Sequence, residues 1–271
     1  MLQPAPPPAI VSRACAPNGS ASPAPARPFG SPSATPIASP APSSPLPSSA
    51  APSPAPARGP AIPAIRPWGT AAWLAQHERF SACAHEGGID AIFLGDSIAA
   101  FFPVRGAGVW SREIAPLGNI VDFGIEGDRT QFVLWRVLHG ELDGSGARAV
   151  VLMVGTNNLA VATPDAIARG IAAIVAAIRE RLPDACVLVS GILPRGAPDD
   201  PRRAKADAVN ARIAALADGD RVRYVDAGAG FVAPDGTIPS ALMPDGLHPS
   251  EAGYEVWAAA LAPALRELLG K

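Results

Sequence analysis

The sequence predicts an α/β fold with a parallel sheet. Apolar runs of strand length alternate with longer segments of helical period, which is typical of this class. The runs are apolar throughout, and continuous apolarity indicates strands buried on both faces. We therefore expect a central five-stranded parallel sheet, with strands at 91–94, 120–123, 149–154, 186–190 and 222–225.

The clearest helix is predicted between the third and fourth strands. Thr163 is a good N-cap, Pro164 suits the first helical position, and the helix ends near Arg181. Isoleucines recur within it at spacings of four, three and four, which gives one core-facing stripe: Ile167, Ile171, Ile174 and Ile178. Other helices are expected at 73–84, 130–139, 203–217 and 250–269.

The chain divides by composition into a tail and one domain. Residues 1–67 hold 20 of the 32 prolines, alternating with Ala and Ser, and few large apolar residues. Such a stretch cannot bury enough surface to offset its ordering entropy, so we expect residues 1–67 to be disordered or polyproline-like. Residues 68–271 are long enough for one layered globular domain.

Charge and hydropathy exclude several classes of protein. The formal net charge of -2, without a block of like charges, gives no footprint for nucleic acid or an anionic membrane. No apolar run is long enough for a transmembrane segment, and the N-terminus lacks the pattern of a signal peptide. We expect a soluble chain of unknown compartment; an extracytoplasmic location would fit if a signal had been trimmed. The three cysteines lack metal-ligand spacing.

Polar residues follow the first three predicted strands, where ligands bind in open parallel sheets. The loops read Gly-Asp-Ser at 95–97, Gly-Ile-Glu-Gly-Asp at 124–128 and Gly-Thr-Asn-Asn at 155–158. Near the C-terminus stands Asp-Gly-Leu-His at 245–248. We expect these four blocks to meet at one edge of the sheet.

Taken in order, the four blocks resemble those of the SGNH, or GDSL-type, hydrolases. The domain is most similar to the intracellular platelet-activating-factor acetylhydrolases, through the segments FGIEGDRTQFVLWRVLHGEL, VGTNN, LPRG, GFVAPDGTI and DGLH. The resemblance covers the globular domain and none of the tail. It implies a three-layer α/β/α, flavodoxin-like fold.

The resemblance also implies a catalytic triad of Ser97, Asp245 and His248. A serine hydroxyl is a poor nucleophile until a base takes its proton, which makes His248 the expected general base for Ser97. Asp245, three residues earlier, is expected to accept the Nδ1 hydrogen of His248 and to stabilise the imidazolium. Asp96 is expected to organise the nucleophile loop through backbone hydrogen bonds.

Three donors are implied for the oxyanion of the tetrahedral intermediate: the backbone N–H groups of Ser97 and Gly127 and the side-chain amide of Asn157. Plainer interpretations stay open. Ser97 could serve only as a helix cap, and Asn157 could serve only to form its turn.

The resemblance places a small acyl pocket around Ile98, Thr156 and Leu247. Two residues depart from the similar enzymes: Asp122 stands in place of Asn, and Glu126 in place of Gly. A carboxylate aimed at the site would oppose an oxyanion. We therefore expect both to point away, with Glu126 at the rim influencing substrate choice.

The leading functional hypothesis is a serine esterase that hydrolyses small, short-chain acyl esters without a metal or cofactor. An acyltransferase using the same site is an alternative, and a catalytically silent binding domain is another. No nucleic acid partner and no transmembrane segment are expected. A homodimer is implied by resemblance alone.

Overall fold

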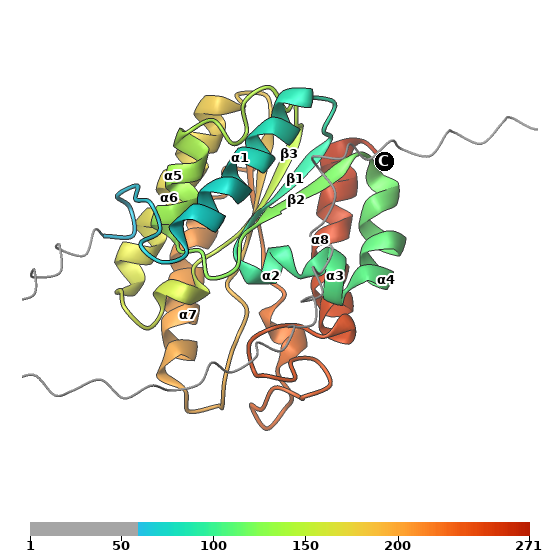
Figure 1. The fold of residues 1–271 in the computed structure, drawn as a ribbon. Helices are drawn as coiled ribbons and strands as arrows, with labels where there is room; N and C mark the ends of the chain where they lie inside the picture. The colour runs from blue at the N-terminus through green and yellow to red at the C-terminus, as the bar shows by residue number, and fades with distance from the viewer. Residues whose placement is uncertain (1–58) are drawn as a thin grey trace, which may run out of the picture. The chain divides into compact units, whose positions relative to one another are not determined.

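The computed structural model describes residues 59–271, which form a parallel sheet with helices on both faces (Figure 1). Most of the predicted tail lies outside the described residues. The five strands are β1 (Ala91–Gly95), β2 (Ile120–Gly124), β3 (Ala149–Met153), β4 (Cys186–Ser190) and β5 (Val222–Val225). All four pairings are parallel, and the strand order is β2-β1-β3-β4-β5. The predicted flavodoxin-like sheet is confirmed.

The longer helices have the following bounds: α1 (Thr70–Glu86), α5 (Thr130–Leu138), α6 (Pro164–Arg181), α7 (Pro201–Ile213) and α8 (Glu251–Leu269). Short helices α2 (Ser97–Ala100), α3 (Phe102–Arg105) and α4 (Ala107–Val109) follow β1 and lead into a π-helix at Trp110–Ile114 and a 3-10 turn at Ala115–Leu117. Further 3-10 turns lie at Thr156–Asn158, Ala214–Leu216 and Gly228–Phe231. Among the described residues no helix is both long and apolar enough to cross a membrane.

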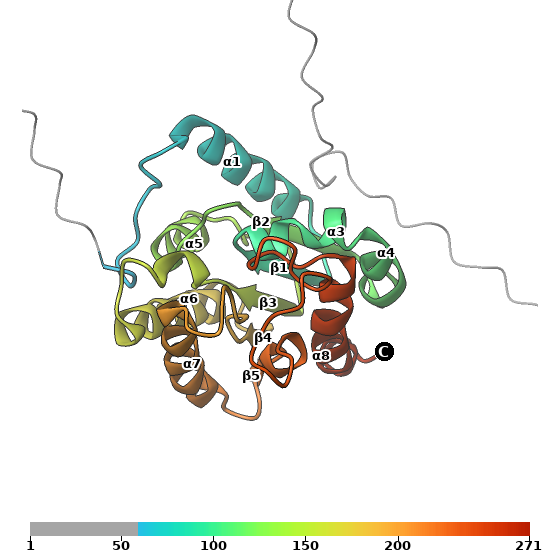
Figure 2. The same ribbon diagram turned by 90° about the horizontal axis from the view of Figure 1, so that it is seen from below.

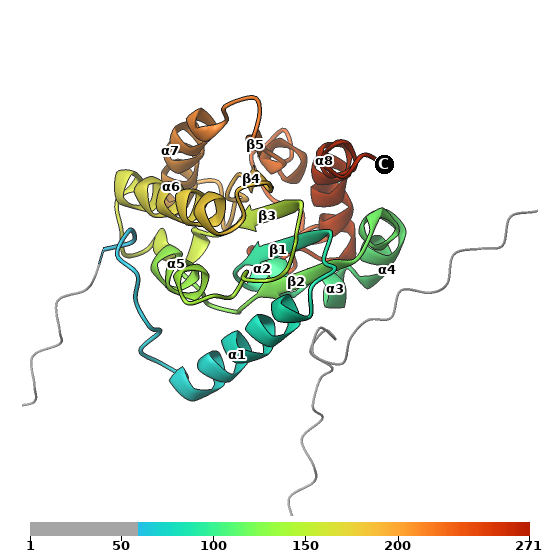
Figure 3. The same ribbon diagram turned by 90° about the horizontal axis from the view of Figure 1, so that it is seen from above.

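Two hydrophobic layers enclose the sheet. Alternate strand residues such as Ile92 and Val150 pack with α1, α5, α6 and α7, whereas Phe93 and Val151 pack with α8 and the short helices after β1. Figures 2 and 3 show these two groups of helices on opposite sides of the strands. β1 and β3 are buried at every position, as their apolar sequences predict.

Local signals explain where the helices start. The Thr163 side chain accepts from Ala166 N, and the predicted isoleucine stripe of α6 is buried. Ser250 caps α8 by accepting from Gly253 N. This cap fixes the point at which the chain leaves the Asp245–His248 loop.

The described chain makes contacts before the expected start of the domain at Trp68. Thr130 Oγ1 donates to Pro60 O over 2.9 Å, and Ala64 N donates to Gln131 O over 3.0 Å. The segment 59–67 is therefore tied to the start of α5. The boundary at residue 68 remains a prediction, and these contacts favour an earlier one.

Candidate active site

The first loop places Ser97 at the start of α2, directly beyond β1. Asp96 is the N-cap residue, and its Oδ1 accepts from Ile98 N over 3.0 Å, as predicted for its structural role. A Cβ at Gly95 would lie 2.0 Å from the carbonyl oxygen of Met153, so only glycine fits between β1 and β3. Ser97 is 5% exposed.

The last loop brings His248 to Ser97 from 151 residues away in the sequence. Ser97 Oγ lies 3.0 Å from His248 Nε2, and His248 Nδ1 lies 2.7 Å from Asp245 Oδ2. The other carboxylate oxygen of Asp245 accepts from the backbone N–H groups of Leu247 and His248 at 3.0 and 2.7 Å. The three residues of the predicted triad thus form one hydrogen-bonded chain.

Electrostatics keep Asp245 ionised. Partial burial acts to raise its pKa, but hydrogen bonds from the backbone and ring of His248 and from the Leu247 N–H outweigh it and lower the pKa to about 2. A neutral imidazole beside this carboxylate would carry its ring hydrogen on Nδ1. Nε2 of that tautomer would accept the hydroxyl hydrogen of Ser97.

Two buried carboxyl groups behind the site are shifted in the opposite direction. Burial raises the pKa of Asp96 to about 7, with Asp128 adding to the rise and the Ile98 N–H opposing it. Burial likewise raises the pKa of Asp122 to about 7, against a hydrogen bond from Gly124 N. Asp96 Oδ2 has no hydrogen-bond partner among the described residues.

The second loop follows β2 and carries Gly127 at φ 76°, a backbone conformation that favours glycine. Asp122 Oδ1 accepts from Gly124 N over 2.5 Å, so this carboxyl is turned toward the end of its own strand. Glu126 is exposed, and its carbonyl accepts from Arg66 Nη1 over 2.7 Å. The expectation that both carboxylates avoid the oxyanion stays a prediction.

The third loop is the 3-10 turn that holds Asn157. Its Nδ2 donates to Asp128 O over 2.9 Å, which ties the third loop to the second. An amide nitrogen carries two hydrogens, so this bond leaves one for a ligand. The oxyanion roles of Ser97, Gly127 and Asn157 remain predictions.

The three residues of the predicted acyl pocket differ in burial. Ile98 is 1% exposed and Thr156 is 2% exposed, while Leu247 is half-buried. Thr156 Oγ1 accepts from Arg195 Nη1 over 3.1 Å. Ile98 and Leu247 adjoin the triad in sequence, and Thr156 adjoins Asn157. The pocket around them stays a prediction.

Sequence reasoning missed several side chains around these loops. Phe101 packs its ring against His248, and Arg195 contacts the third loop. Arg136, inside apolar α5, donates to the carbonyls of Phe123 and Gly95. Its charge within a hydrophobic run was the one signal that could have revealed it.

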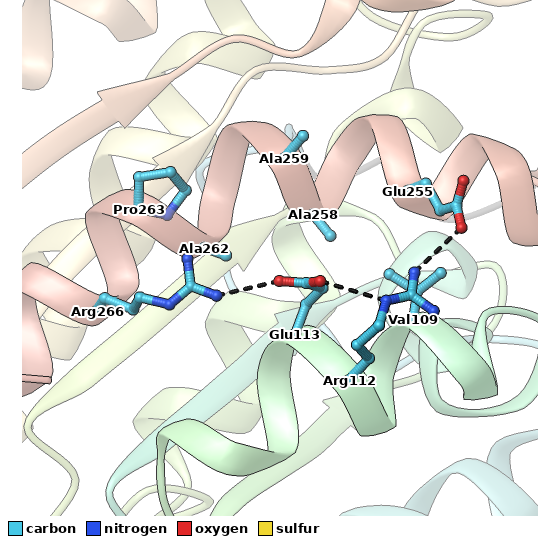
Figure 4. Close-up of a pocket in the computed structure, with 9 residues that line it drawn as sticks. All are labelled: Val109, Arg112, Glu113, Glu255, Ala258, Ala259, Ala262, Pro263 and Arg266. Carbon is cyan, nitrogen blue, oxygen red and sulfur yellow. Dashed lines mark hydrogen bonds and ion pairs between the residues drawn. The ribbon is translucent and has the colours of Figure 1, made fainter.

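A separate pocket of about 390 Å³ lies between α8 and the helical turns near Val109 (Figure 4). Its charged residues pair with one another: Arg112 with Glu113 and Glu255 at 3.3 and 3.1 Å, and Arg266 with Glu113 at 3.0 Å. None of the predicted site residues lines it. The candidate active site is therefore the edge of the sheet, not this pocket.

Nothing in the described part of the chain gathers three or more His, Cys, Asp or Glu side chains into a group that could hold a metal ion. The side chains that the structure assembles at the strand ends are instead a serine, a histidine and a carboxylate in hydrogen-bond contact. This arrangement can move a proton from a hydroxyl to an imidazole.

Comparisons with known proteins agree with the fold. The GDSL-like lipase/acylhydrolase family model matches residues 93–256. The human platelet-activating factor acetylhydrolase IB subunit alpha1 is 40% identical over 204 residues, which cover 75% of this chain and 87% of that protein. A GDSL-like lipase from Bacteroides thetaiotaomicron aligns with a TM-score of 0.59 at 20% identity, over 72% of this chain and 97% of its own. An acetylxylan esterase from Geobacillus stearothermophilus aligns with a TM-score of 0.52 at 21% identity, over 68% and 95%. The chain belongs to the GDSL-like lipase/acylhydrolase family.

Proposed function

We propose that this chain is a serine esterase that hydrolyses short-chain acyl esters through an acyl-enzyme. Family membership supports ester hydrolysis in general. The observation that carries the serine mechanism is the Ser97–His248–Asp245 chain, with contacts of 3.0 and 2.7 Å. These are the separations at which a base can take a hydroxyl proton.

In the first half-reaction Ser97 Oγ attacks the ester carbonyl carbon while His248 Nε2 takes its proton. The oxyanion that forms is held by the N–H groups of Ser97 and Gly127 and by the amide of Asn157. When the intermediate collapses, the bond to the alkoxy oxygen breaks and His248 gives its proton to the departing alcohol. Asp245 stabilises the imidazolium between these two transfers.

In the second half-reaction water takes the place of the alcohol. The water oxygen attacks the carbonyl carbon of the acyl-enzyme while His248 accepts a proton from that water. His248 then returns the proton to Ser97 Oγ when the carboxylic acid leaves.

A short acyl group is the expectation for a pocket lined by Ile98, Thr156 and Leu247. Ile98 and Thr156 are almost fully buried and Leu247 is half-buried, so a pocket between them would leave little room for a long chain. Two of the similar proteins are named for acetyl esters, an acetylhydrolase and an acetylxylan esterase. We propose acetate or propionate as the acyl group.

The test is turnover of p-nitrophenyl acetate by Ser97→Ala and His248→Ala. Each should lose nearly all activity while keeping the far-ultraviolet dichroism of the parent. Ser81→Ala is a matched control because its hydroxyl has no hydrogen-bond partner among the described residues, and exposed His85→Ala controls for losing an imidazole. Substantial turnover by purified Ser97→Ala would reject the proposal.

A further inference from the structure

A buried ionic cluster lies beneath the loops of the site. The side chains of Asp128, Arg136 and Glu141 are each 0% exposed. Arg136 Nε lies 3.0 Å from Asp128 Oδ2, and Arg136 Nη1 donates to Glu141 Oε1. Trp73 Nε1 donates to Asp128 Oδ1 over 2.8 Å, and His77 Nδ1 lies 2.9 Å from Glu141 Oε2. Each carboxylate therefore contacts a second side chain besides Arg136 and is held in place.

Stability alone does not explain why this ionic cluster is buried in the core. Burying charged groups costs desolvation energy, and buried ion pairs can often be replaced by apolar residues without loss of stability. The surrounding layer is apolar, since Phe80, Phe123 and Val137 belong to the same core. The contacts that the Arg136 guanidinium makes with the backbone offer another explanation for the presence of this cluster.

Arg136 joins the carboxyl ends of two strands. Its Nη1 donates to Phe123 O over 2.9 Å, near the end of β2, and its Nη2 donates to Gly95 O over 3.2 Å, at the end of β1. Gly95 O also accepts from Ile125 N over 3.1 Å. One rigid, planar group thus fixes the spacing between the loop that starts at Gly95 and the loop that follows Phe123.

Each proposed oxyanion donor is close in sequence, or joined by a hydrogen bond, to a residue that contacts this guanidinium. Ser97 stands two residues after Gly95. Gly127 stands between two anchored residues, Phe123 and Asp128. The side chain of Asn157 donates to the carbonyl of Asp128, the residue whose carboxylate pairs with Arg136.

We infer that Arg136 is a positioning residue for the oxyanion hole, holding the three loops that carry Ser97, Gly127 and Asn157 at their working separation. The inference rests on the proposed function, because it needs those three groups to act on a developing negative charge. Arg136 itself is buried beneath the loops and touches backbone carbonyls, so it acts through the donors. Misplacing donors by a fraction of an ångström weakens transition-state stabilisation more than substrate binding.

The experiment compares kcat and KM for p-nitrophenyl acetate in Arg136→Met, Arg136→Lys, Asn157→Ala and the double variant Arg136→Met/Asn157→Ala. Arg136→Met should lower kcat at least tenfold with KM within about threefold, because the loss falls on the transition state. Arg136→Lys should recover part of the loss, since lysine keeps the charge without the planar fork. In the Asn157→Ala background Arg136→Met should cost less than it does alone, because one of the three donors that Arg136 positions has already been removed.

Ile178→Ala is the control for lost stability, since Ile178 is fully buried in α6. It should lower the melting temperature while leaving kcat unchanged below that temperature. If Arg136→Met does not fold, Glu141→Gln replaces it: this substitution keeps the size of the side chain and weakens its hold on Arg136, and it should also lower kcat selectively. Full kcat in a folded Arg136→Met or Glu141→Gln, or strict additivity with Asn157→Ala, would overturn the inference. Activity surviving in Ser97→Ala would instead overturn the proposed function.

Discussion

The ring of Phe101 lies against the imidazole of His248, with centroids 5.2 Å apart and planes inclined by 60°. Phe101 follows Ser97 by one helical turn, so the helical start of this segment places both the nucleophile and the ring beside the base. The guanidinium carbon of Arg105 lies 4.0 Å from the ring centroid of Phe101. The imidazole is therefore fixed by packing on its face as well as by Asp245 at its edge.

Replacing Phe101 should loosen His248. Asp245 is half exposed, so its hydrogen bond competes with water and does not fix the ring alone. Phe101→Ala should lower kcat for p-nitrophenyl acetate by about tenfold to a hundredfold, the usual cost of misaligning a catalytic group. Phe101→Leu, which keeps apolar bulk, should lose less. Equal kcat in the parent, Phe101→Ala and Phe101→Leu would show that the Phe101 ring does not orient His248.

Asn157→Ala should lower turnover far more than it weakens substrate binding. The amide is proposed to act mainly on developing charge, and removing one such donor typically costs about a hundredfold to a thousandfold in kcat. Asn119→Ala is a control, because its amide donates to Gly88 O near the opposite ends of the strands. A rise in KM with unchanged kcat would make Asn157 a substrate-binding residue instead.

The sheet could be predicted almost to the residue because apolarity marks buried parallel strands so strongly. The segment from Ser97 to Leu117 could not, since Pro103, Gly106 and Gly108 break the helical period into short turns. Because these short turns were not predicted, Phe101 was not recognised as a neighbour of His248. Its place there depends on the helical turn that begins at Ser97.

The four sequence motifs predicted which loops form the site. The distances between their side chains could not be predicted, because they depend on the fold. Ser97 and His248 are 151 residues apart in sequence, and their 3.0 Å contact depends on how the last loop returns to the first. Arg136 was missed for a different reason. A charged residue in an apolar helix normally lies on the solvent side, and only the structure places it under the loops.

The segment before α1 should contribute to stability. A chain beginning at Trp68 loses the three hydrogen bonds that join Pro60, Ala64 and Arg66 to Thr130, Gln131 and Glu126. Together these are worth roughly 3 kcal/mol at about 1 kcal/mol each. It should melt several degrees below a chain beginning at Gly59, measured by calorimetry. Equal melting temperatures would place the boundary at residue 68 as the composition predicts.

Asp96 should make stability fall as pH rises. Folding raises its pKa from 3.8 to about 7. Its contribution is therefore fully present below about pH 4 and is lost as pH rises through about 7. The shift corresponds to at most about 4 kcal/mol.

Asp96→Asn cannot ionise, so its free energy of unfolding relative to the parent should increase between about pH 4 and 7 and level off above that. Urea unfolding at several pH values measures this difference. Asp220→Asn, at an exposed position, is the comparison. A pH-independent difference for Asp96→Asn would mean that Asp96 stays ionised in the folded protein.

Turnover should fall steeply as the acyl chain lengthens from acetate to octanoate. Ile98 and Thr156 are nearly inaccessible, so the proposed pocket, if they bound it, could not widen without moving the core. Burying one more methylene gains only about 0.8 kcal/mol, whereas overpacking a fixed site costs about 1 to 3 kcal/mol. The cost of overpacking should therefore exceed the gain from burial for acyl chains longer than about four carbons. The measurement is kcat/KM for p-nitrophenyl acetate, butyrate and octanoate.

Leu247 provides the matched variant, because it is only half-buried and can be truncated without opening the core. Leu247→Ala should raise kcat/KM for butyrate relative to acetate, since the removed side chain leaves room for about two to three methylenes. The parent should show its maximum at acetate or propionate. A maximum at octanoate in the parent would instead reveal an open groove, and an unchanged preference in Leu247→Ala would remove this residue from the acyl pocket.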